Sequence, residues 1–436
     1  MRIFLALVAV ALVGVVAACS GGRGQSTPPG SNISQGTVLG IVWHENEGVL
    51  RRFDRPSLTP TSERVKLGHN GGAWSFSPDR SKVAVAGGAP LEVRIVDLYR
   101  MRLEGVAPLP GNFVPPPGEP AVIVLAWPTA RRILALVEWG AWGHAVVVLD
   151  PVERRIVSRQ TIDGTLVGQA ATHDGLALLL APPARIGPSR LLLVDAAGKQ
   201  RAIPLAEVRA GLETIDVDSA VSRVDVPALA VDPTGARALV IPAGGPVADI
   251  DLATGNVLYR EVREAVSILG RLRNWLEPTA EAKAREGPER QATWLGSDFV
   301  AVSGQDARRL ANGQDQEQTT PAGLALIDVR DWTKRTLDEQ ASQFSFSAGT
   351  LLAYGTSWNS ATQKTTGMGL TAYGLDGEER FHLFEDEPIY YVETAGSYAY
   401  VWRNGAPPVT VDLRSGSVIR KILRDQESDL PALIVP

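Results

Sequence analysis

The sequence is informative first in what it has little of. It holds one cysteine among 436 residues, so no intrachain disulfide, cysteine-based metal cluster, redox pair or haem attachment motif can form. Its five histidines have no zinc-motif spacing, and no phosphate-binding glycine loop, nucleophile elbow or EF-hand loop is present. We therefore predict no catalytic residues, no metal and no cofactor. The net charge of −5 gives no reason to expect a nucleic acid partner.

The one long apolar run stands at the N-terminus. A basic residue is followed by uncharged, mostly apolar residues as far as Ala18, a run too short for a membrane-spanning helix, which needs about 20 apolar residues. We therefore predict a signal peptide over residues 1–18. The run ends Val-Ala-Ala-Cys at Cys19, which resembles the bacterial lipobox. The resemblance implies that the Cys19 thiol is acylated.

Residues 19–35 are rich in glycine, serine and proline and have no apolar periodicity, which predicts a flexible tether. The chain is then expected to sit on the cell membrane or the outer membrane, outside the cytoplasm and held by a lipid anchor. Hydrophobic residues make up 44% of the chain, enough for a large core. We expect residues 36–436 to form that folded domain.

Internal repetition organises residues 36–436. A short apolar strand that ends in aspartate and leads into a turn recurs eight times. The aspartates are Asp54, Asp97, Asp150, Asp195, Asp251, Asp328, Asp376 and Asp412. Most copies follow an alternating strand, a tight turn and a strand of small residues, as at Ala73–Ala86. Each unit reads as four short antiparallel strands, which we name a to d, and this is typical of a β-propeller blade.

Two motifs strengthen this interpretation. The stretch Trp74–Asp79, Trp-Ser-Phe-Ser-Pro-Asp, resembles the periplasmic WD40-like propeller repeats, and Asp251–Tyr259 is similar to the quinoprotein-type repeat, with a weaker copy at Val411–Val418. The resemblance implies an all-β, quinoprotein-like propeller. We predict eight blades, with seven as the alternative because the first and fifth units are irregular. The C-terminal segment Leu430–Val435 is expected to join the strands after Thr37 and close the ring.

The long connections are predicted to share one face. In the propellers that this chain resembles, the b-to-c and d-to-a loops emerge together, and the long excursions here, 108–120, 206–224, 263–291 and 305–322, are all of these two kinds. Apolar residues at helical spacing also predict an amphipathic helix within 263–291. Because binding residues concentrate on loops over a rigid scaffold, this face is the predicted binding face.

Aromatic side chains with polar neighbours lie at or near these connections, and such pairs supply contact area and hydrogen bonds together. The candidate binding residues are Trp43, His44, Glu45, Trp139, Trp142, His144, Trp275, Trp358, Asn359, Trp402 and Arg403. The alternative is that the tryptophans pack between blade ends and that the helix covers apolar surface.

Three classes of function stay open. The preferred one is a non-catalytic protein-binding or scaffolding module with a cell-envelope protein or small ligand as partner, similar in plan to the lipoprotein propeller of outer-membrane barrel assembly. The second is a propeller enzyme of the quinoprotein or lyase type. The third is a solute or glycan sensor that uses the tryptophan-bearing face.

Overall fold

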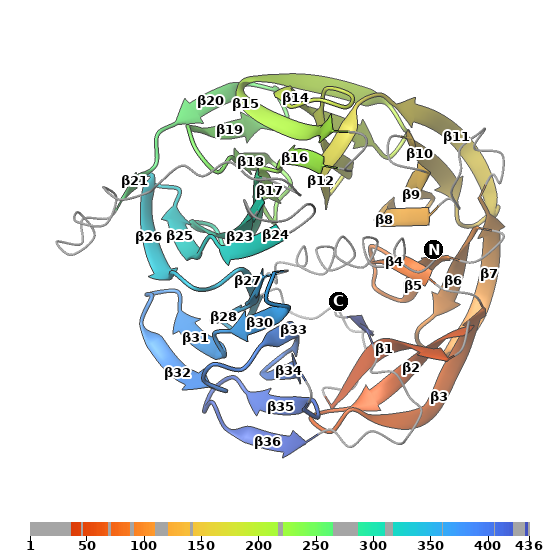
Figure 1. Cartoon of the computed structure of the whole chain (residues 1–436). Coiled ribbons are helices and arrows are strands. Elements are labelled where there is room, and N and C mark those ends of the chain that lie inside the picture. Colours follow the sequence, from red (N-terminus) through yellow and green to blue (C-terminus); the bar gives the residue numbers. More distant parts are fainter. Residues whose placement is uncertain are drawn as a thin grey trace. The chain divides into compact units, whose positions relative to one another are not determined.

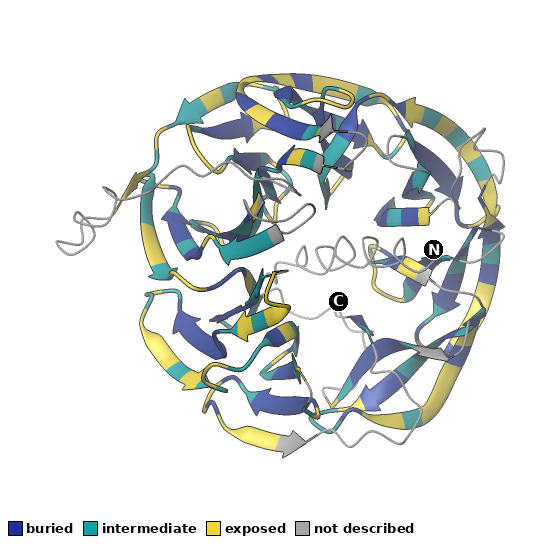
Figure 2. Cartoon of the chain, in the orientation of Figure 1, coloured by how far each residue is buried: buried dark blue, intermediate teal, exposed yellow. Residues whose placement is uncertain are grey.

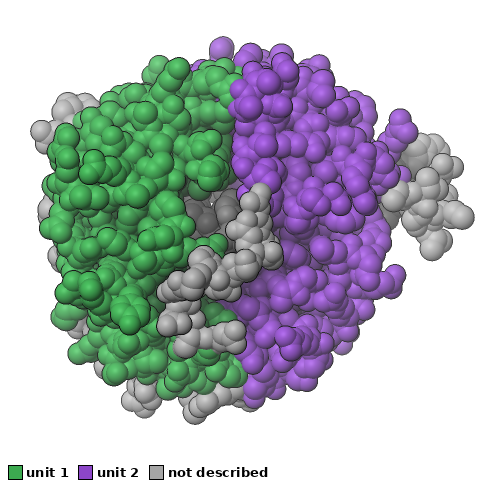
Figure 3. Space-filling view, turned by 180° about the vertical axis from the view of Figure 1, so that it is seen from behind, with its two compact units in different colours: residues 1–178, 192–203, 422–436 green, residues 179–191, 204–421 purple. Residues whose placement is uncertain are grey.

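The structure is a computed structural model. It describes residues 36–44, 47–68, 71–87, 91–109, 121–139, 143–216, 221–264, 287–309, 317–359, 361–404, 406–421 and 432–434. Within these ranges every regular element is a β-strand, and we find no helix of the length and apolarity that a membrane crossing requires. The chain divides into two compact units, coloured separately in Figure 3. Unit 1 takes residues 1–178, 192–203 and 422–436, and unit 2 takes residues 179–191 and 204–421.

Three sheets of unit 1 each have four antiparallel strands (Figure 1). The first contains β1 (Thr37–His44), β2 (Glu47–Asp54), β3 (Thr59–Gly68) and β37 (Ala432–Ile434). The second contains β4 (Gly71–Phe76), β5 (Lys82–Gly87), β6 (Glu92–Asp97) and β7 (Arg102–Pro108). The third contains β8 (Ala121–Thr129), β9 (Arg132–Trp139), β10 (Gly143–Asp150) and β11 (Arg155–Ile162). The prediction of four-stranded antiparallel units is confirmed in these sheets.

A fourth sheet has five strands. Its strands are β12 (Thr165–Ala171), β13 (Gly175–Ala181), β14 (Gly187–Asp195), β15 (Gln200–Asp216) and β16 (Val221–Asp225), paired in that order. The fifth strand, β16, arises because β15 continues for 17 residues and then turns back on itself. The predicted loop over 206–224 is therefore wrong for most of its length, since the polar residues there form a hairpin.

Unit 2 holds four further groups of strands. The first is β17 (Ala228–Val231), β18 (Arg237–Ile241), β19 (Val247–Asp251) and β20 (Val257–Arg260). The second is an eight-stranded sheet that contains β21 (Arg263–Glu264), β22 (Gly287–Leu295), β23 (Phe299–Arg309), β24 (Glu317–Pro321), β25 (Leu324–Asp328), β26 (Thr333–Asp338), β29 (Thr356–Asn359) and β30 (Lys364–Gly367). The third is a four-stranded sheet of β27 (Gln343–Ser347), β28 (Thr350–Tyr354), β31 (Leu370–Gly374) and β32 (Glu379–Leu383). The fourth is β33 (Ile389–Ala395), β34 (Tyr398–Arg403), β35 (Val409–Asp412) and β36 (Val418–Lys421).

The first sheet draws its strands from both ends of the described chain. β37 pairs antiparallel with β1, and Leu39 lies opposite Ile434. The side chains of Leu39 and Ile434 are buried in the same apolar cluster, together with Leu50 of β2. The last described residues therefore supply the a strand of the sheet that the first described residues begin.

The core of each unit lies on the middle strands of its sheets. All seven residues of β13 are buried, and so are seven of the eight residues of β10. In contrast, β11 alternates between exposed and half-buried residues along most of its length, as expected for a strand with one face in solvent (Figure 2). Within unit 1 the first strands β4 and β8 contact each other, and the fourth strands β7 and β11 do the same. Apolar side chains fill the space between neighbouring sheets.

The repeated aspartate has a shared structural role. In seven of the eight copies its Oδ1 atom accepts a backbone N–H two to four residues later and so stabilises the c-to-d turn. The seven are Asp97, Asp150, Asp195, Asp251, Asp328, Asp376 and Asp412. In the eighth copy the main-chain carbonyl of Asp54 accepts the Leu58 N–H instead. The repeated aspartate therefore stabilises the turn that follows each strand, and this structural role explains why it recurs.

We expect Asp150→Ala to lower the free energy of unfolding by about 2 kcal/mol at neutral pH, since two hydrogen bonds to a charged group are lost. Asp150 is 4% exposed, accepts the backbone N–H groups of Val152 and Glu153 at 2.9 and 3.0 Å, and pairs with Arg132 at 3.2 Å. The hydrogen bond from Glu153, with that from Val152, holds the pKa of Asp150 below its ordinary value of 3.8. Urea denaturation at several pH values measures the effect.

The lowered pKa of Asp150 determines how its contribution to stability depends on pH. A depressed pKa gives stability that is present above pH about 4 and is lost as the pH falls through the folded-state pKa. The difference between wild type and Asp150→Ala should therefore shrink in acid. The matched control is Asp174→Ala, whose side chain is 88% exposed. Equal effects of the two substitutions at neutral pH would contradict the role of the turn aspartate.

Candidate functional site

The long connections of unit 2 form additional strands rather than loops. β23 continues past its core partner β25 to pair with β24, and Gln318 of β24 pairs with Asn359 of β29, which in turn pairs with β30. At the other end, a parallel bridge joins Val226, directly after β16, to Glu289 of β22. The prediction of a loop over 305–322 is therefore wrong at both of its described ends, which form β23 and β24.

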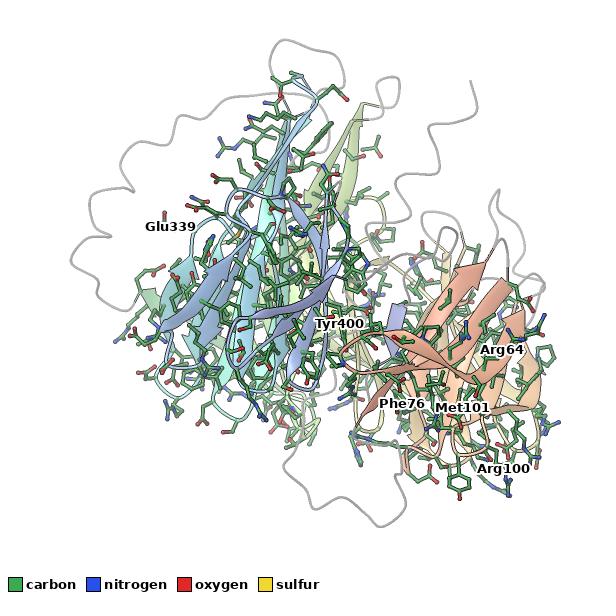
Figure 4. The ribbon with its side chains drawn as sticks, turned by 90° about the horizontal axis from the view of Figure 1, so that it is seen from below. Arg64, Phe76, Arg100, Met101, Glu339 and Tyr400 are labelled. Atoms are coloured by element: carbon green, nitrogen blue, oxygen red, sulfur yellow. The ribbon has the colours of Figure 1, made fainter. Side chains whose placement is uncertain are left out.

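We call these strands the extension: β15 after residue 205, β16, the first five residues of β22, β23 after residue 302, β24, β29 and β30. In Figure 4 the green β15–β16 hairpin and the cyan to blue strands β23, β24, β29 and β30 project on the same side of unit 2. The predicted helix within 263–291 lies outside the described residues, apart from the ends that form β21 and β22. Most of the excursion 108–120 also lies outside them.

The extension is polar. The first seven residues of β22 and all four residues of β29 are half-buried, and β30 alternates between exposed and half-buried residues. By contrast, all five residues of β28 in the same unit are buried. Because burial of apolar surface is the main source of stability, β29 and β30 add little to the core, whereas Val208, Ala210 and Val224 of the β15–β16 hairpin are buried.

Four candidate binding residues lie on or beside the extension. Trp358 and Asn359 are on β29, where the Trp358 N–H donates to Thr319 Oγ1 of β24 at 3.0 Å. Trp402 and Arg403 end β34, and the Trp402 ring packs on Tyr391 with centroids 5.1 Å apart. The structure therefore places the four residues on elements of one unit.

Glu387 connects these elements. Arg403 Nη1 donates to Glu387 Oε2 at 2.9 Å, and the guanidinium stacks over the Phe384 ring at 4.5 Å. The Glu387 carbonyl accepts the Gly369 N–H at 3.1 Å, two residues after β30. At Gly367, the last residue of β30, a Cβ atom would lie 2.2 Å from the same carbonyl oxygen. The end of β30 thus lies directly against the residue that Arg403 binds.

Two candidates lie in unit 1 and have mainly packing contacts. His144 is 3% exposed, and its Nε2 atom is 3.6 Å from Glu138 Oε2 on the neighbouring strand. Trp139 packs against the apolar cluster of unit 1 and covers Gly143. The remaining candidates, Cys19, Glu45, Trp142 and Trp275, lie outside the described residues, as do the side chains of Trp43 and His44.

A cavity that the sequence did not predict lies in unit 2, between strands of the extension and Ile186. Its volume is about 320 Å³. Its lining residues are Ile186, Arg209, Glu213, Arg223, Val224, Asp225, Gly287 and Pro288. The signal for it was the alternation of buried Val208 and Ala210 with exposed Arg209, which is a strand pattern. The sequence instead predicts a long connection over 206–224, and that prediction places no cavity there.

Asp225 is a cavity residue whose pKa is shifted. Burial raises the pKa of its carboxyl group, although Arg209 and Arg290 act in the opposite direction. Within the described ranges no hydrogen-bond donor contacts this carboxylate. Arg290 already donates to Asp306 Oδ1 at 2.7 Å and to the Gln305 carbonyl at 3.1 Å. Among the described residues, no group of three or more histidine, cysteine or acidic side chains is placed to hold a metal ion.

No protein-family model and no curated protein matches the chain. Solved structures do resemble it. The dihydro-heme d1 dehydrogenase NirN in complex with DHE has a TM-score of 0.53 and 13% identity, over 93% of this chain and 77% of that one. BamB from Moraxella catarrhalis has a TM-score of 0.42 and 9% identity, over 83% and 92%. Hydrazine synthase from Kuenenia stuttgartiensis has a TM-score of 0.37 and 15% identity, over 65% and 78%.

These neighbours are propeller-like proteins, and the likeness concerns the fold alone. Together with the four-stranded antiparallel sheets, the similarity to NirN supports the predicted β-propeller fold.

Proposed function

We propose that this chain is a membrane-anchored, extracytoplasmic β-propeller lipoprotein that acts as a non-catalytic protein-binding or scaffolding module. Its anchor is the acylated Cys19, and its partner is a protein of the cell envelope. We further propose that the propeller has eight blades and that its terminal strands close the ring. The pairing of β37 with β1 supports this closure.

The observation that carries the proposal is the extension. Its strands β29 and β30 are ordered although none of their residues is buried, and ordering backbone costs about 1–2 kcal/mol per residue. At its far side β30 pairs only with β29 within the described residues, so one edge of β30 is open to an added strand. Such an edge binds an extended segment of another protein through main-chain hydrogen bonds. Trp358 and Trp402 offer side-chain contacts nearby.

Site-specific photocrosslinking tests this proposal in cells. A photoreactive amino acid at Lys364, exposed on β30, should crosslink one envelope protein in high yield. The matched control position is Val152, which is 63% exposed on a c-to-d turn of unit 1. A specific adduct from position 364 that is lacking at position 152 supports the proposal. No adduct at either position, or the same adducts at both, contradicts it.

A solute sensor is the second candidate, and the cavity at Asp225 is the observation that favours it. A propeller enzyme is a weaker candidate. The solved neighbour with the TM-score of 0.53 is an enzyme by its title, but at 13% identity its activity does not transfer to this chain. A cofactor that copurifies with the full chain would favour the enzyme.

A further inference from the structure

On one side, the cavity in unit 2 is lined by side chains of alternating positive and negative charge. Along β15, Arg209 and Glu213 are four residues apart and so point to the same face of the strand. On β16, Arg223 lies opposite Glu213, and Asp225 lies opposite Gly211. All four charged residues line the cavity. Positive and negative groups therefore alternate both along the strands and across them.

Beside the cavity, glycine allows two close approaches of one backbone segment to another. At Gly287, with φ at +132°, a Cβ atom would lie 1.8 Å from the Val224 carbonyl oxygen. At Gly211, with φ at +143°, it would lie 2.3 Å from the Arg185 carbonyl oxygen. These two positions bring β22 and the segment before β14 against the hairpin without filling the space beside Asp225.

The charged groups are available to a ligand to different degrees. Arg209 and Arg223 are exposed, and neither has an ion-pair partner in contact among the residues that the structure describes. Asp225 is half-buried, so its carboxyl group lacks full solvation, and this burial raises the pKa of the group. A ligand that donates N–H hydrogen bonds to Asp225 would replace the hydrogen bonds to water that burial has removed.

We propose that this cavity binds a small zwitterion of the amino acid or dipeptide class, with its ammonium group at Asp225 and its carboxylate at Arg209 and Arg223. A purely anionic ligand would meet Glu213 and Asp225, and a purely cationic one would meet the arginines. Only a ligand that carries both signs satisfies both. The volume of about 320 Å³ lies at the lower end of the range for small-molecule sites, which suits a ligand of this size.

Isothermal titration calorimetry with the full chain in detergent tests the proposal. The probe is L-alanyl-L-alanine, compared with its N-acetyl form and its C-terminal amide, each of which lacks one charge. We expect the free dipeptide to bind and each blocked form to bind at least about tenfold more weakly, the loss expected for one charged hydrogen bond. No binding of the free dipeptide, or equal binding of all three, would overturn the proposal.

Variants then assign the two ends of the ligand. Asp225→Asn and Arg223→Gln should each weaken binding of the free dipeptide about tenfold. Asp225→Asn should not weaken the N-acetyl form further, because the acetyl group has already removed the charge that Asp225 binds. Arg64→Gln is the control, since Arg64 is an exposed arginine on β3 of unit 1 (Figure 4). If Arg64→Gln weakens binding of the free dipeptide as much, the assignment is contradicted. It is also contradicted if Asp225→Asn weakens binding of the free and the N-acetyl dipeptide equally.

Discussion

Replacing Arg237 with leucine is expected to lower the free energy of unfolding by about 3 kcal/mol, the cost of leaving a buried carboxylate without its main partner. Arg237 of β18 donates from Nε and Nη2 to the two carboxylate oxygens of Asp249, at 2.6 and 2.9 Å. The Asp249 side chain is 9% exposed. Its only other ion-pair partner among the described residues is Arg260, at 3.4 Å.

The same guanidinium also joins two sheets of unit 2. It lies 5.5 Å from the ring centroids of both Trp294 and Trp332, which belong to the group of strands after β20. Cation–π contacts of this kind contribute about 0.5–2 kcal/mol each. Arg237→Leu therefore removes an ion pair and two ring contacts at once. Urea denaturation followed by tryptophan fluorescence measures the loss and also detects any movement of the rings.

Three comparisons make this result specific. Arg260→Leu removes a longer and more exposed contact to Asp249, so we expect a loss of about 1 kcal/mol. Arg237→Lys keeps the charge but not the two-point geometry, and should fall between wild type and leucine. Replacing Arg237 and Asp249 together by leucine should recover part of the loss, because no unpaired buried charge is left. If Arg237→Leu leaves the free energy of unfolding unchanged, the Arg237–Asp249 ion pair contributes nothing to stability.

Replacing Cys19 with serine is expected to release the protein from the membrane completely. Acyl chains contribute about 0.8 kcal/mol per buried CH₂, and two or three chains on one residue give stable anchoring, whereas serine at this position accepts none. Fractionation of cells that produce wild type and Cys19→Ser should show membrane-bound and soluble protein, respectively. Intact-mass measurement of the extracted wild type should show a diacyl or triacyl adduct.

The control for this experiment is Ser20→Ala, which changes the next residue of the predicted tether and leaves the thiol in place. It should behave as wild type. An unmodified wild-type protein in the soluble fraction would rule out the lipid anchor.

The sequence predicted those parts of the fold that depend on local signals. The aspartates at the ends of apolar strands are such local signals. Each accepts a hydrogen bond from a backbone N–H two to four residues later, as Asp412 does from the Arg414 N–H. The short runs of apolar residues also predicted the middle strands of each repeat, because these strands are buried on both sides.

The extension and its cavity were not predictable in the same way. Residues 317–321, Glu-Gln-Thr-Thr-Pro, carry no apolar alternation, and they are a strand only because β23 and β29 lie on either side. The cavity depends on the register that sets Arg223 opposite Glu213 and on the close approach of β22 at Gly287. The approach of Gly287 to Val224 is a contact between segments distant in sequence. The contact of Arg237 with two tryptophans is of the same kind.

The pairing of β37 with β1 bears on when the chain can fold. The first sheet needs residues 432–434, so it stays incomplete until the segments between β1 and β37 have been synthesised. Until then β1 has a bare edge, and Leu39 and Ile41 lack the Ile434 side chain beside them. On our proposal that the chain is exported, this order keeps the N-terminal region unfinished, and therefore easier to unravel, during transit. Pairing of β37 then fastens the edge of β1.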